Sequence, residues 1–559
     1  MKQFRISLLV VALSLMVTGM AFAVDIPNIS TWTQSMGVGG GGPGRGDALI
    51  APLYDVRPLT DTRLPGSAGT TAQTQFTLLS IVNTDRNYGA IVRMRFREWK
   101  RSRECLDIDI PLTTNDVWVG QVAQKTGGGA TLTTPAGGGE RWVSANPVQS
   151  SVTVGAILYP YGYFPGALFP TAGLDFTTYA IEAEETNKLA RCEYGYIEFF
   201  GEERVAAPTT TAEPWLFPRI ASTTDALAGC TTANEPACNG YGRDVHDVLM
   251  GNIYLVRPTQ AISHQYNMTA LSDFAVDSTG IWFNTAFAQP NFYDSVQGGP
   301  GNLGTNPGIG GFIQLEAILA RRLVYAQYIT GTDPADSSAT PMSTSEVITF
   351  PTKHFHYDTT DNSRHESGAL ALIGTQKVLR PPFTGLRETL HDELVSTAIA
   401  ACSVGENVIL KIYDRNEHTF APGAPISPPP VIPPGKLPYE VNVIGFYPSE
   451  SATSEFRNNV VASTAGGGQT FYEGYAITDL GSSDQGEDTI TFNFFGNIFQ
   501  SYNGLPAVGI VMSEFYNGGV QGYYGNTVPW QYRVDWYATT TAPNNINLAN
   551  SPGMLSTDP

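Results

Sequence analysis

The stretch between residues 91 and 110 alternates apolar and polar side chains so regularly that it constrains the fold more than any other part of the chain. Three apolar residues alternate with three arginines, and then three more alternate with a cysteine and two aspartates. These residues are Val92, Met94, Phe96, Arg93, Arg95, Arg97, Leu106, Ile108, Ile110, Cys105, Asp107 and Asp109. Because successive side chains of a strand point to opposite faces, the pattern predicts a β-hairpin. Pairing its halves around Arg101 places Arg95 opposite Asp107 and Arg93 opposite Asp109, so one face is apolar and the other is a ladder of opposite charges.

Short runs of strand-forming residues recur along the rest of the chain. They lie at 48–54, 76–82, 117–122, 194–200, 248–256, 347–350, 408–413, 441–446, 489–495, 507–512 and 532–537. Loops that draw on 58 glycines and 38 prolines separate them, and this organisation is typical of β-sandwiches. We therefore predict a mainly β fold of one or more antiparallel β-sandwich domains with long Gly/Pro-rich loops and a few short helices. Helices are expected at 314–328, where apolar residues recur at helical spacing, and at 384–401.

The first 23 residues have the three parts of a bacterial export signal. Lys2 and Arg5 supply positive charge, residues 6–17 are apolar, and Ala21-Phe22-Ala23 fits the small-x-small cleavage rule. The apolar run is shorter than the about 20 residues that span a bilayer. We expect cleavage before Val24 and export by the Sec pathway to the cell surface or exterior, with the periplasm as the alternative, and no later transmembrane segment.

Composition divides the remaining chain into four parts. Residues 24–48 are glycine-rich and expected to be flexible. Residues 49–420 form the β-rich main region, as one sandwich domain or two. Residues 421–438 are proline-rich and read as a linker or crossover, and residues 439–559 as a C-terminal β-rich unit.

The charge of the chain limits the classes of partner that it can bind, and its cysteines bear on the compartment in which it folds. The formal net charge of −19 argues against nucleic acid or anionic lipid as a partner. Of five cysteines, Cys230 and Cys238 flank a short polar loop and are the expected disulfide in an oxidising compartment. The pairing of Cys105, Cys192 and Cys402 stays open, and at least one of these three is expected to be a free thiol.

Two segments contain residues of the types that bind metals. His354, His356 and Asp358 would share one face of a strand and could chelate zinc. Their H-x-H-x-D spacing resembles the metallo-β-lactamase motif, but no histidine follows Asp358 and the αββα pattern of that fold is missing. The alternative is a polar strand face that leads into a turn.

The second segment is the acidic loop at 479–488. Asp484, Glu487 and Asp488 offer oxygen ligands suited to calcium, although the spacing is not that of an EF-hand. A solvated turn is the alternative. Of the two metals, calcium is the better supported as a cofactor, and the sequence requires neither.

Two further groups of residues have a binding interpretation beside a structural one. Arg93, Arg95 and Arg97 belong to a basic stripe at 86–103, which is either the internal ladder described above or a docking patch for acidic glycans or a neighbouring acidic subunit. Aromatic and amide residues gather between 515 and 537, where they either stack on sugars or fill a sandwich core.

Several phrases of the sequence resemble those of secreted β-rich surface proteins of Gram-negative bacteria that have no known activity. They lie at 77–84, 90–110, 117–120, 349–353 and 413–417. The resemblance implies a secreted protein whose similarity extends over most of the mature chain, and it transfers no catalytic residue.

The sequence favours a structural function over an enzymatic one. It has no G-x-S-x-G, phosphate-binding-loop or H-E-x-x-H motif. We expect a secreted, non-enzymatic structural protein, such as a surface-layer, matrix or filament subunit that associates with itself. The alternative is a secreted carbohydrate-binding protein or glycan hydrolase that contacts cell-surface glycan.

Overall fold

The structure of the chain is a computed structural model. It describes residues 25–26, 45–57, 75–134, 141–144, 151–154, 157–160, 167–178, 181, 188–206, 248–258, 262–271, 292, 319–321, 323–330, 342–354, 383, 406–415, 436–437, 439–447, 460–466, 469–480, 490–494, 498–502, 504–516 and 523–529.

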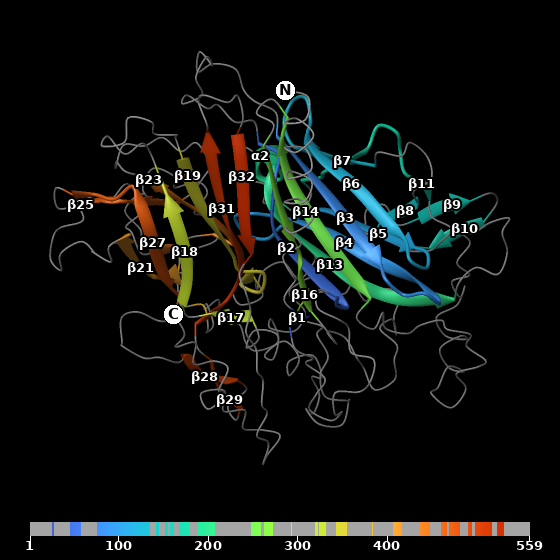
Figure 1. Ribbon diagram of the computed structural model, residues 1–559. Coiled ribbons are helices and arrows are strands. Elements are labelled where there is room, and N and C mark those ends of the chain that lie inside the picture. The colour runs from blue at the N-terminus through green and yellow to red at the C-terminus, as the bar shows by residue number, and fades with distance from the viewer. Residues whose placement is uncertain are drawn as a thin grey trace.

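Two large sheets make up one side of the molecule (Figure 1). The eight-stranded sheet contains, in spatial order, β1 (Asp25–Ile26), β16 (Thr269–Leu271), β2 (Ala48–Asp55), β13 (Tyr194–Ala206), β4 (Tyr88–Glu98), β5 (Glu104–Leu112), β8 (Arg141–Ser144) and β11 (Ala167–Leu168). The six-stranded sheet contains β12 (Leu174–Asp175), β7 (Ala130–Thr133), β6 (Val117–Gln124), β3 (Phe76–Asn83), β14 (Leu249–Arg257) and β15 (Ile262–Asn267). Apart from the parallel pair β1–β16, the neighbouring strands of both sheets run antiparallel.

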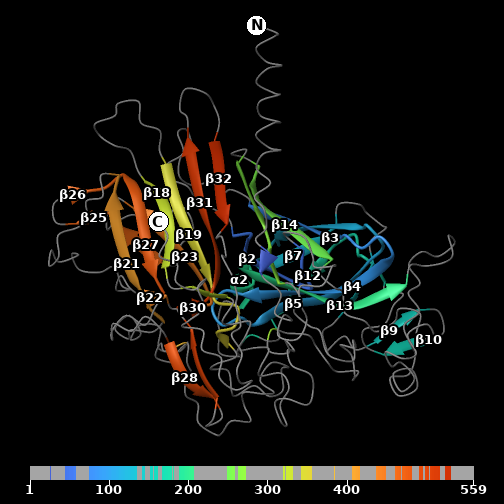
Figure 2. The same cartoon turned by 60° about the horizontal axis from the view of Figure 1, so that its bottom comes forward.

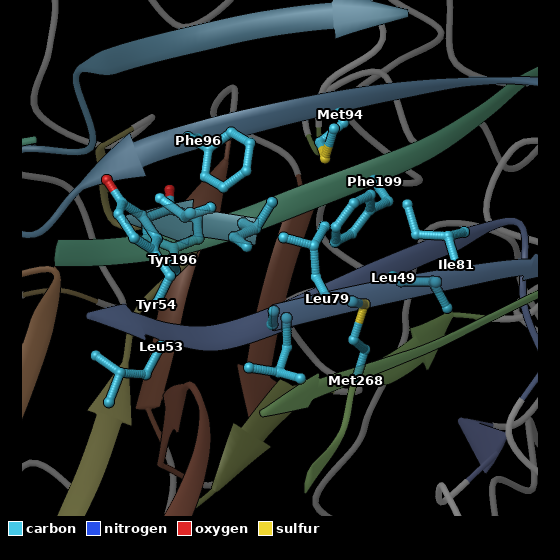
Figure 3. Packing of buried hydrophobic residues seen from close by; sticks show 14 of the residues in the cluster. Leu49, Leu53, Tyr54, Leu79, Ile81, Met94, Phe96, Tyr196, Phe199 and Met268 are labelled. Atoms are coloured by element: carbon cyan, nitrogen blue, oxygen red, sulfur yellow. The ribbon is translucent and has the colours of Figure 1, made fainter. Parts of the chain in front are cut away.

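The apolar sides of these two sheets share one buried core (Figure 3). Leu49 and Phe199 contribute from the eight-stranded sheet, and Leu79 and Ile81 contribute from the six-stranded sheet. β3 is buried at every second residue, as expected for a strand with one face in a core. Burying each large side chain of this kind stabilises the fold by about 1.5–3 kcal/mol.

The hairpin predicted from the alternating segment is confirmed. β4 and β5 pair antiparallel with Arg95 opposite Asp107 and Arg93 opposite Asp109. The apolar residues between these charged positions also pair across the hairpin, and all of them are buried in the core: Val92 with Ile110, Met94 with Ile108, and Phe96 with Leu106. The register shifts by one residue after Phe96, next to the turn at 99–103.

Two more sheets make up the other side of the molecule (Figures 1 and 2). The five-stranded sheet contains β24 (Val460–Ser463), β23 (Val441–Tyr447), β19 (Met342–Thr349), β31 (Val508–Tyr516) and β32 (Tyr523–Pro529). The three-stranded sheet contains β18 (Leu323–Ile329), β27 (Glu473–Asp479) and β21 (Ile409–Asp414). The ring of Tyr328 in the smaller sheet stacks on Phe446 in the larger one, with 5.3 Å between ring centroids. The two sheets therefore pack face to face.

The five-stranded sheet also packs against the first pair of sheets. Its other face sends Val347, Val443 and Met512 into the core described above, and the Thr349 hydroxyl donates to the Pro52 carbonyl at 2.7 Å. β19 precedes the proline-rich segment 421–438, whereas its neighbours β23 and β31 follow that segment. Strands from both sides of the segment are thus partners in one sheet.

The remaining described elements are short. Five two-stranded sheets pair β9 (Ser151–Val154) with β10 (Ile157–Pro160), β17 (Ala320–Arg321) with β30 (Leu505–Pro506), β20 (Glu406–Asn407) with β22 (Lys436–Leu437), β25 (Ala465–Gly466) with β26 (Gln469–Thr470), and β28 (Ile490–Phe494) with β29 (Ile498–Tyr502). α2 (Lys188–Arg191) is a single turn of helix. The predicted mainly β class with antiparallel, sandwich-like sheets is confirmed.

The helix predicted at 314–328 is wrong where the structure describes this segment. Residues 320–321 and 323–329 are strands. Val324, Ala326 and Tyr328 are buried while Tyr325 and Gln327 are exposed, so the period is two rather than 3.6. Leucines at helical spacing suggested a helix, but pairing with β27 decides the conformation of β18. The helix predicted at 384–401 and the strand predicted at 532–537 lie outside the described residues.

A disulfide joins Cys105 and Cys192, whose Cα atoms are 5.8 Å apart. Cys105 lies in β5, and Cys192 lies between α2 and β13. Both are fully buried in the shared core. The bond spans a sequence separation of 87 residues, and it settles the pairing of two of the three cysteines that the sequence left open.

Replacing Cys105 and Cys192 together by serine is expected to lower the free energy of unfolding by about 2–4 kcal/mol, because the unfolded chain loses a long closed loop. Chemical denaturation of the wild-type protein and the double variant, both with oxidised disulfides, measures this difference. Adding a reductant should lower the stability of the wild-type protein more than that of the variant, which keeps only the predicted Cys230–Cys238 bond. Equal stability of the two proteins without reductant would contradict the prediction.

Candidate functional site

Most of the metal-binding and disulfide residues predicted from the sequence lie outside the described residues. These are Asp484, Glu487, Asp488, His356, Asp358, Cys230 and Cys238. His354 is described: it is buried and follows a turn at 351–353 after β19. His354 therefore lies beyond the end of β19. Its expected arrangement with His356 and Asp358 stays a prediction, because those two residues lie outside the described ranges. Within the described ranges, no cluster of three or more His, Cys, Asp or Glu residues is arranged to hold a metal ion.

Three arginines of the basic stripe, those on strand β4, lie inside the protein. Arg93, Arg95 and Arg97 are between 0% and 2% exposed. The Arg93 Nε atom lies 2.7 Å from an Asp107 carboxylate oxygen, and Arg97 Nε lies 2.8 Å from a Glu198 carboxylate oxygen. Of the two interpretations that the sequence allowed, the internal ladder is the one the structure shows. The guanidinium groups are not displayed as a docking patch.

Two carboxylates connect this ladder to neighbouring strands. Asp107 accepts from both Arg93 and Arg95, and Glu198 of β13 lies within ion-pair distance of Arg95 and Arg97. Burial by itself raises the pKa of Asp107, but the two arginines outweigh this effect and hold the pKa below its usual range. The ladder is therefore a charged layer inside the fold, and its role is structural.

The late aromatic residues are described only in part. Phe515, Tyr516, Tyr523 and Tyr524 belong to β31 and β32, whereas the aromatic residues from 530 onward lie outside the described ranges. Their interpretation as sugar-stacking or core residues stays a prediction.

A different surface of the described structure combines aromatic and aliphatic side chains. The odd-numbered residues of the three-stranded sheet (323–329, 473–479 and 409–415) point away from the five-stranded sheet and form what we call the tyrosine face. Tyr325 is 47% exposed and Ile409 is 37% exposed. The rings of Tyr413 and Tyr475 stack across two strands, with centroids 4.7 Å apart and planes 10° from parallel.

Charged residues surround the apolar part of the tyrosine face. Arg415 and Glu473 form an ion pair of 2.5 Å at one end, and both side chains are largely exposed. Asp479 lies at the other end of β27, and the exposed Lys411 lies on β21 beside Ile477. The tyrosine face thus carries two positive and two negative side chains on a chain of net charge −19.

The other side of the three-stranded sheet is fixed to β19 of the five-stranded sheet. The Thr478 hydroxyl donates to Glu346 at 2.9 Å, and the Thr344 hydroxyl donates to the Ile329 carbonyl at 3.1 Å. Glu346 is fully buried, and among the described residues its second carboxylate oxygen has no hydrogen-bond partner. Burial raises the pKa of Glu346 to about 8 even though the Thr478 hydrogen bond acts in the opposite direction.

A second polar cluster lies where β15 meets β31 and β32. The two ring nitrogens of His264 lie 2.8 Å from a Glu514 carboxylate oxygen and 3.1 Å from the Thr527 hydroxyl. Arg257 pairs with the same carboxylate. Histidine, carboxylate and hydroxyl are the groups of a hydrolytic triad, but His264 is 2% exposed and the arginine neutralises the carboxylate. The cluster acts as a tether between the six-stranded and five-stranded sheets.

Sequence reasoning missed the tyrosine face for two reasons. β18 was interpreted as a helix, and the run at 473–479 was not recognised as a strand. The sequence carries no apolar–polar alternation in these strands, because apolar residues occur on both faces; only the burial pattern in the structure shows that the even-numbered residues are the more buried set.

The fold and this surface together define a mainly β protein of packed antiparallel sheets with an exposed aromatic face. Comparisons of the chain with protein-family models, with curated proteins and with solved structures found no match. In the part of the chain that the structure describes, no helix is long and apolar enough to cross a membrane.

Proposed function

We propose that the protein is an exported, non-enzymatic structural subunit of the bacterial cell surface or exterior, and that it works by contact between protein surfaces. The tyrosine face is the observation that carries this proposal. An antiparallel sheet with one buried face usually presents polar side chains to water on the other. Here seven of the twelve outward residues are aliphatic or aromatic, and exposed apolar patches of this kind commonly mark interaction sites.

Two further observations support export. The N-terminal 23 residues have the composition of a cleaved signal peptide. The Cys105–Cys192 bond joins distant parts of the chain, and disulfides of this kind are typical of secreted and periplasmic proteins because the cytosol keeps thiols reduced.

A carbohydrate-binding function is the second candidate, because tyrosines on a flat sheet can stack on sugar rings. Tyr325 favours it, since its ring is half exposed. Tyr413 and Tyr475 favour it less, because they stack on each other and this pairing uses ring faces that a sugar would need.

Size-exclusion chromatography with light scattering separates the two functions. The exported protein, with its expected N-terminus at Val24, is run over a range of concentrations with Ca²⁺ and with a chelator. A structural subunit is expected to increase in mass with concentration. A protein that stays monomeric at every concentration and is retained by polysaccharide would contradict the structural function and support the carbohydrate-binding one.

A further inference from the structure

We propose that the tyrosine face docks against the same face of a second copy of this chain. This inference rests on the proposed function as a structural subunit and names the surface through which that function would operate. A contact that uses the same patch on both partners is the commonest arrangement in homodimers, and it requires a patch that complements itself.

The arrangement of side chains on the tyrosine face fits a protein partner. Tyr325, Ile477 and Tyr475 occupy its middle, whereas Glu473 and Asp479 lie at the two ends of β27. Interfaces between proteins are commonly built in this way, with aromatic and apolar residues at the centre and charged residues at the rim. Aliphatic side chains such as Ile409 and Ile477 pack well against a second apolar surface and contribute little to sugar stacking.

Charge identifies the partner as a second copy. Two chains of net charge −19 repel each other over most of their surfaces. The tyrosine face carries Lys411 and Arg415 together with Glu473 and Asp479, so its own charges cancel. When two copies meet through this face, the positive side chains of each copy can approach the negative side chains of the other. An acidic glycan would meet two carboxylates there.

The face is also held in shape before it meets a partner. Its sheet is fixed to the five-stranded sheet by the Tyr328–Phe446 stack and by the Thr478–Glu346 hydrogen bond. A surface that is already ordered loses little conformational entropy on binding. Three strands of about seven residues cover roughly 14 Å by 23 Å. This area is about 320 Å² per copy, well below the about 800 Å² per partner of a standard specific interface, so the association is expected to be weak and dependent on concentration.

Single lysine substitutions on the face test the proposal. Tyr325→Lys and Ile409→Lys are each expected to raise the dissociation constant for self-association about tenfold or more, because each replaces an exposed apolar side chain of the face with a solvated ammonium group. The matched control is Val117→Lys, since Val117 is 51% exposed and lies on β6 of the six-stranded sheet. All three variants add the same positive charge and so reduce general repulsion equally. Sedimentation velocity over a range of concentrations measures the association, and circular dichroism checks that each variant is folded.

The possible results distinguish a failure of the proposed docking surface from a failure of the proposed structural function. Loss of association in Tyr325→Lys and Ile409→Lys, but not in Val117→Lys, supports the proposal. If all three variants associate as strongly as the wild type, the tyrosine face is not the association surface, but the proposed structural function is unaffected. A wild-type protein that is monomeric at every concentration overturns both. If the wild type binds a neutral polysaccharide and only the two face variants lose that binding without any change in mass, the face is a sugar platform and the proposal is wrong.

Discussion

Replacing Glu346 by glutamine is expected to raise the free energy of unfolding at pH 9 by about 3–5 kcal/mol and to change it by no more than about 1 kcal/mol at pH 4. The carboxyl is fully buried between two sheets, and its only hydrogen bond in the described structure comes from Thr478. Burial without a compensating charge favours the neutral acid. Glutamine has nearly the same shape and stays neutral at every pH.

The direction of this pH dependence follows from the pKa of Glu346, which is about 8 in the folded protein against an ordinary value of 4.5. The folded protein binds the proton of this carboxyl more tightly than the unfolded chain does. The contribution of the protonated carboxyl to stability is therefore fully present below pH 4.5. That contribution is lost as the pH rises from 4.5 through 8. Each pKa unit corresponds to about 1.4 kcal/mol, which gives the magnitude above.

Urea denaturation of the wild type and of Glu346→Gln at intervals between pH 4 and pH 9 measures the effect. Glu473→Gln is the matched control, because the Glu473 side chain is 46% exposed and not buried between two sheets. Wild-type stability should fall relative to Glu346→Gln as the pH rises, whereas Glu473→Gln should follow the wild type. Parallel pH profiles for wild type and Glu346→Gln would show that Glu346 is not buried as a neutral acid.

The parts of the fold that were predicted correctly are those with a local signal. The β4–β5 register follows from alternation on both sides of one turn, because the two halves of a hairpin are neighbours in sequence and in space. β3 and β14 were predicted as short runs of strand-forming residues. The alternation also predicted which side chains share a face, but it did not show that the charged face of the eight-stranded sheet is buried as well.

The parts that were missed depend on contacts between distant residues. Cys105 pairs with a residue 87 positions away, and Glu346 meets Thr478 at a separation of 132 residues. Nothing near Glu346 in the sequence distinguishes it from a surface glutamate on a strand. Its unusual pKa arises only when the three-stranded sheet covers it. The tyrosine face likewise exists only because three separate strands come together in one sheet.

Removing the carboxylate of Asp107 is expected to be among the most destabilising single changes in the described structure. Asp107→Leu should lower the free energy of unfolding by about 3–5 kcal/mol, because removing one partner leaves buried charge without its counterion. The side chains of Arg93, Arg95 and Asp107 are all at most 3% exposed, so water cannot take the place of the lost carboxylate. Both arginines would lose the carboxylate that they share.

A double-mutant cycle with Arg93→Leu distinguishes loss of the ion pair from loss of packing. Because the double variant removes a positive and a negative charge together, its destabilisation should be smaller than the two single effects combined. Asp175→Ala provides the comparison for an exposed pair. Asp175 bonds Lys125 at the surface with both side chains about half exposed, and such pairs contribute about 0–1 kcal/mol. Urea denaturation at pH 7 gives all four values. Additive effects of the Arg93 and Asp107 substitutions would mean that the buried ladder contributes to stability through shape alone. If Asp175→Ala lowered the free energy of unfolding as much as Asp107→Leu, burial would not set the strength of these ion pairs.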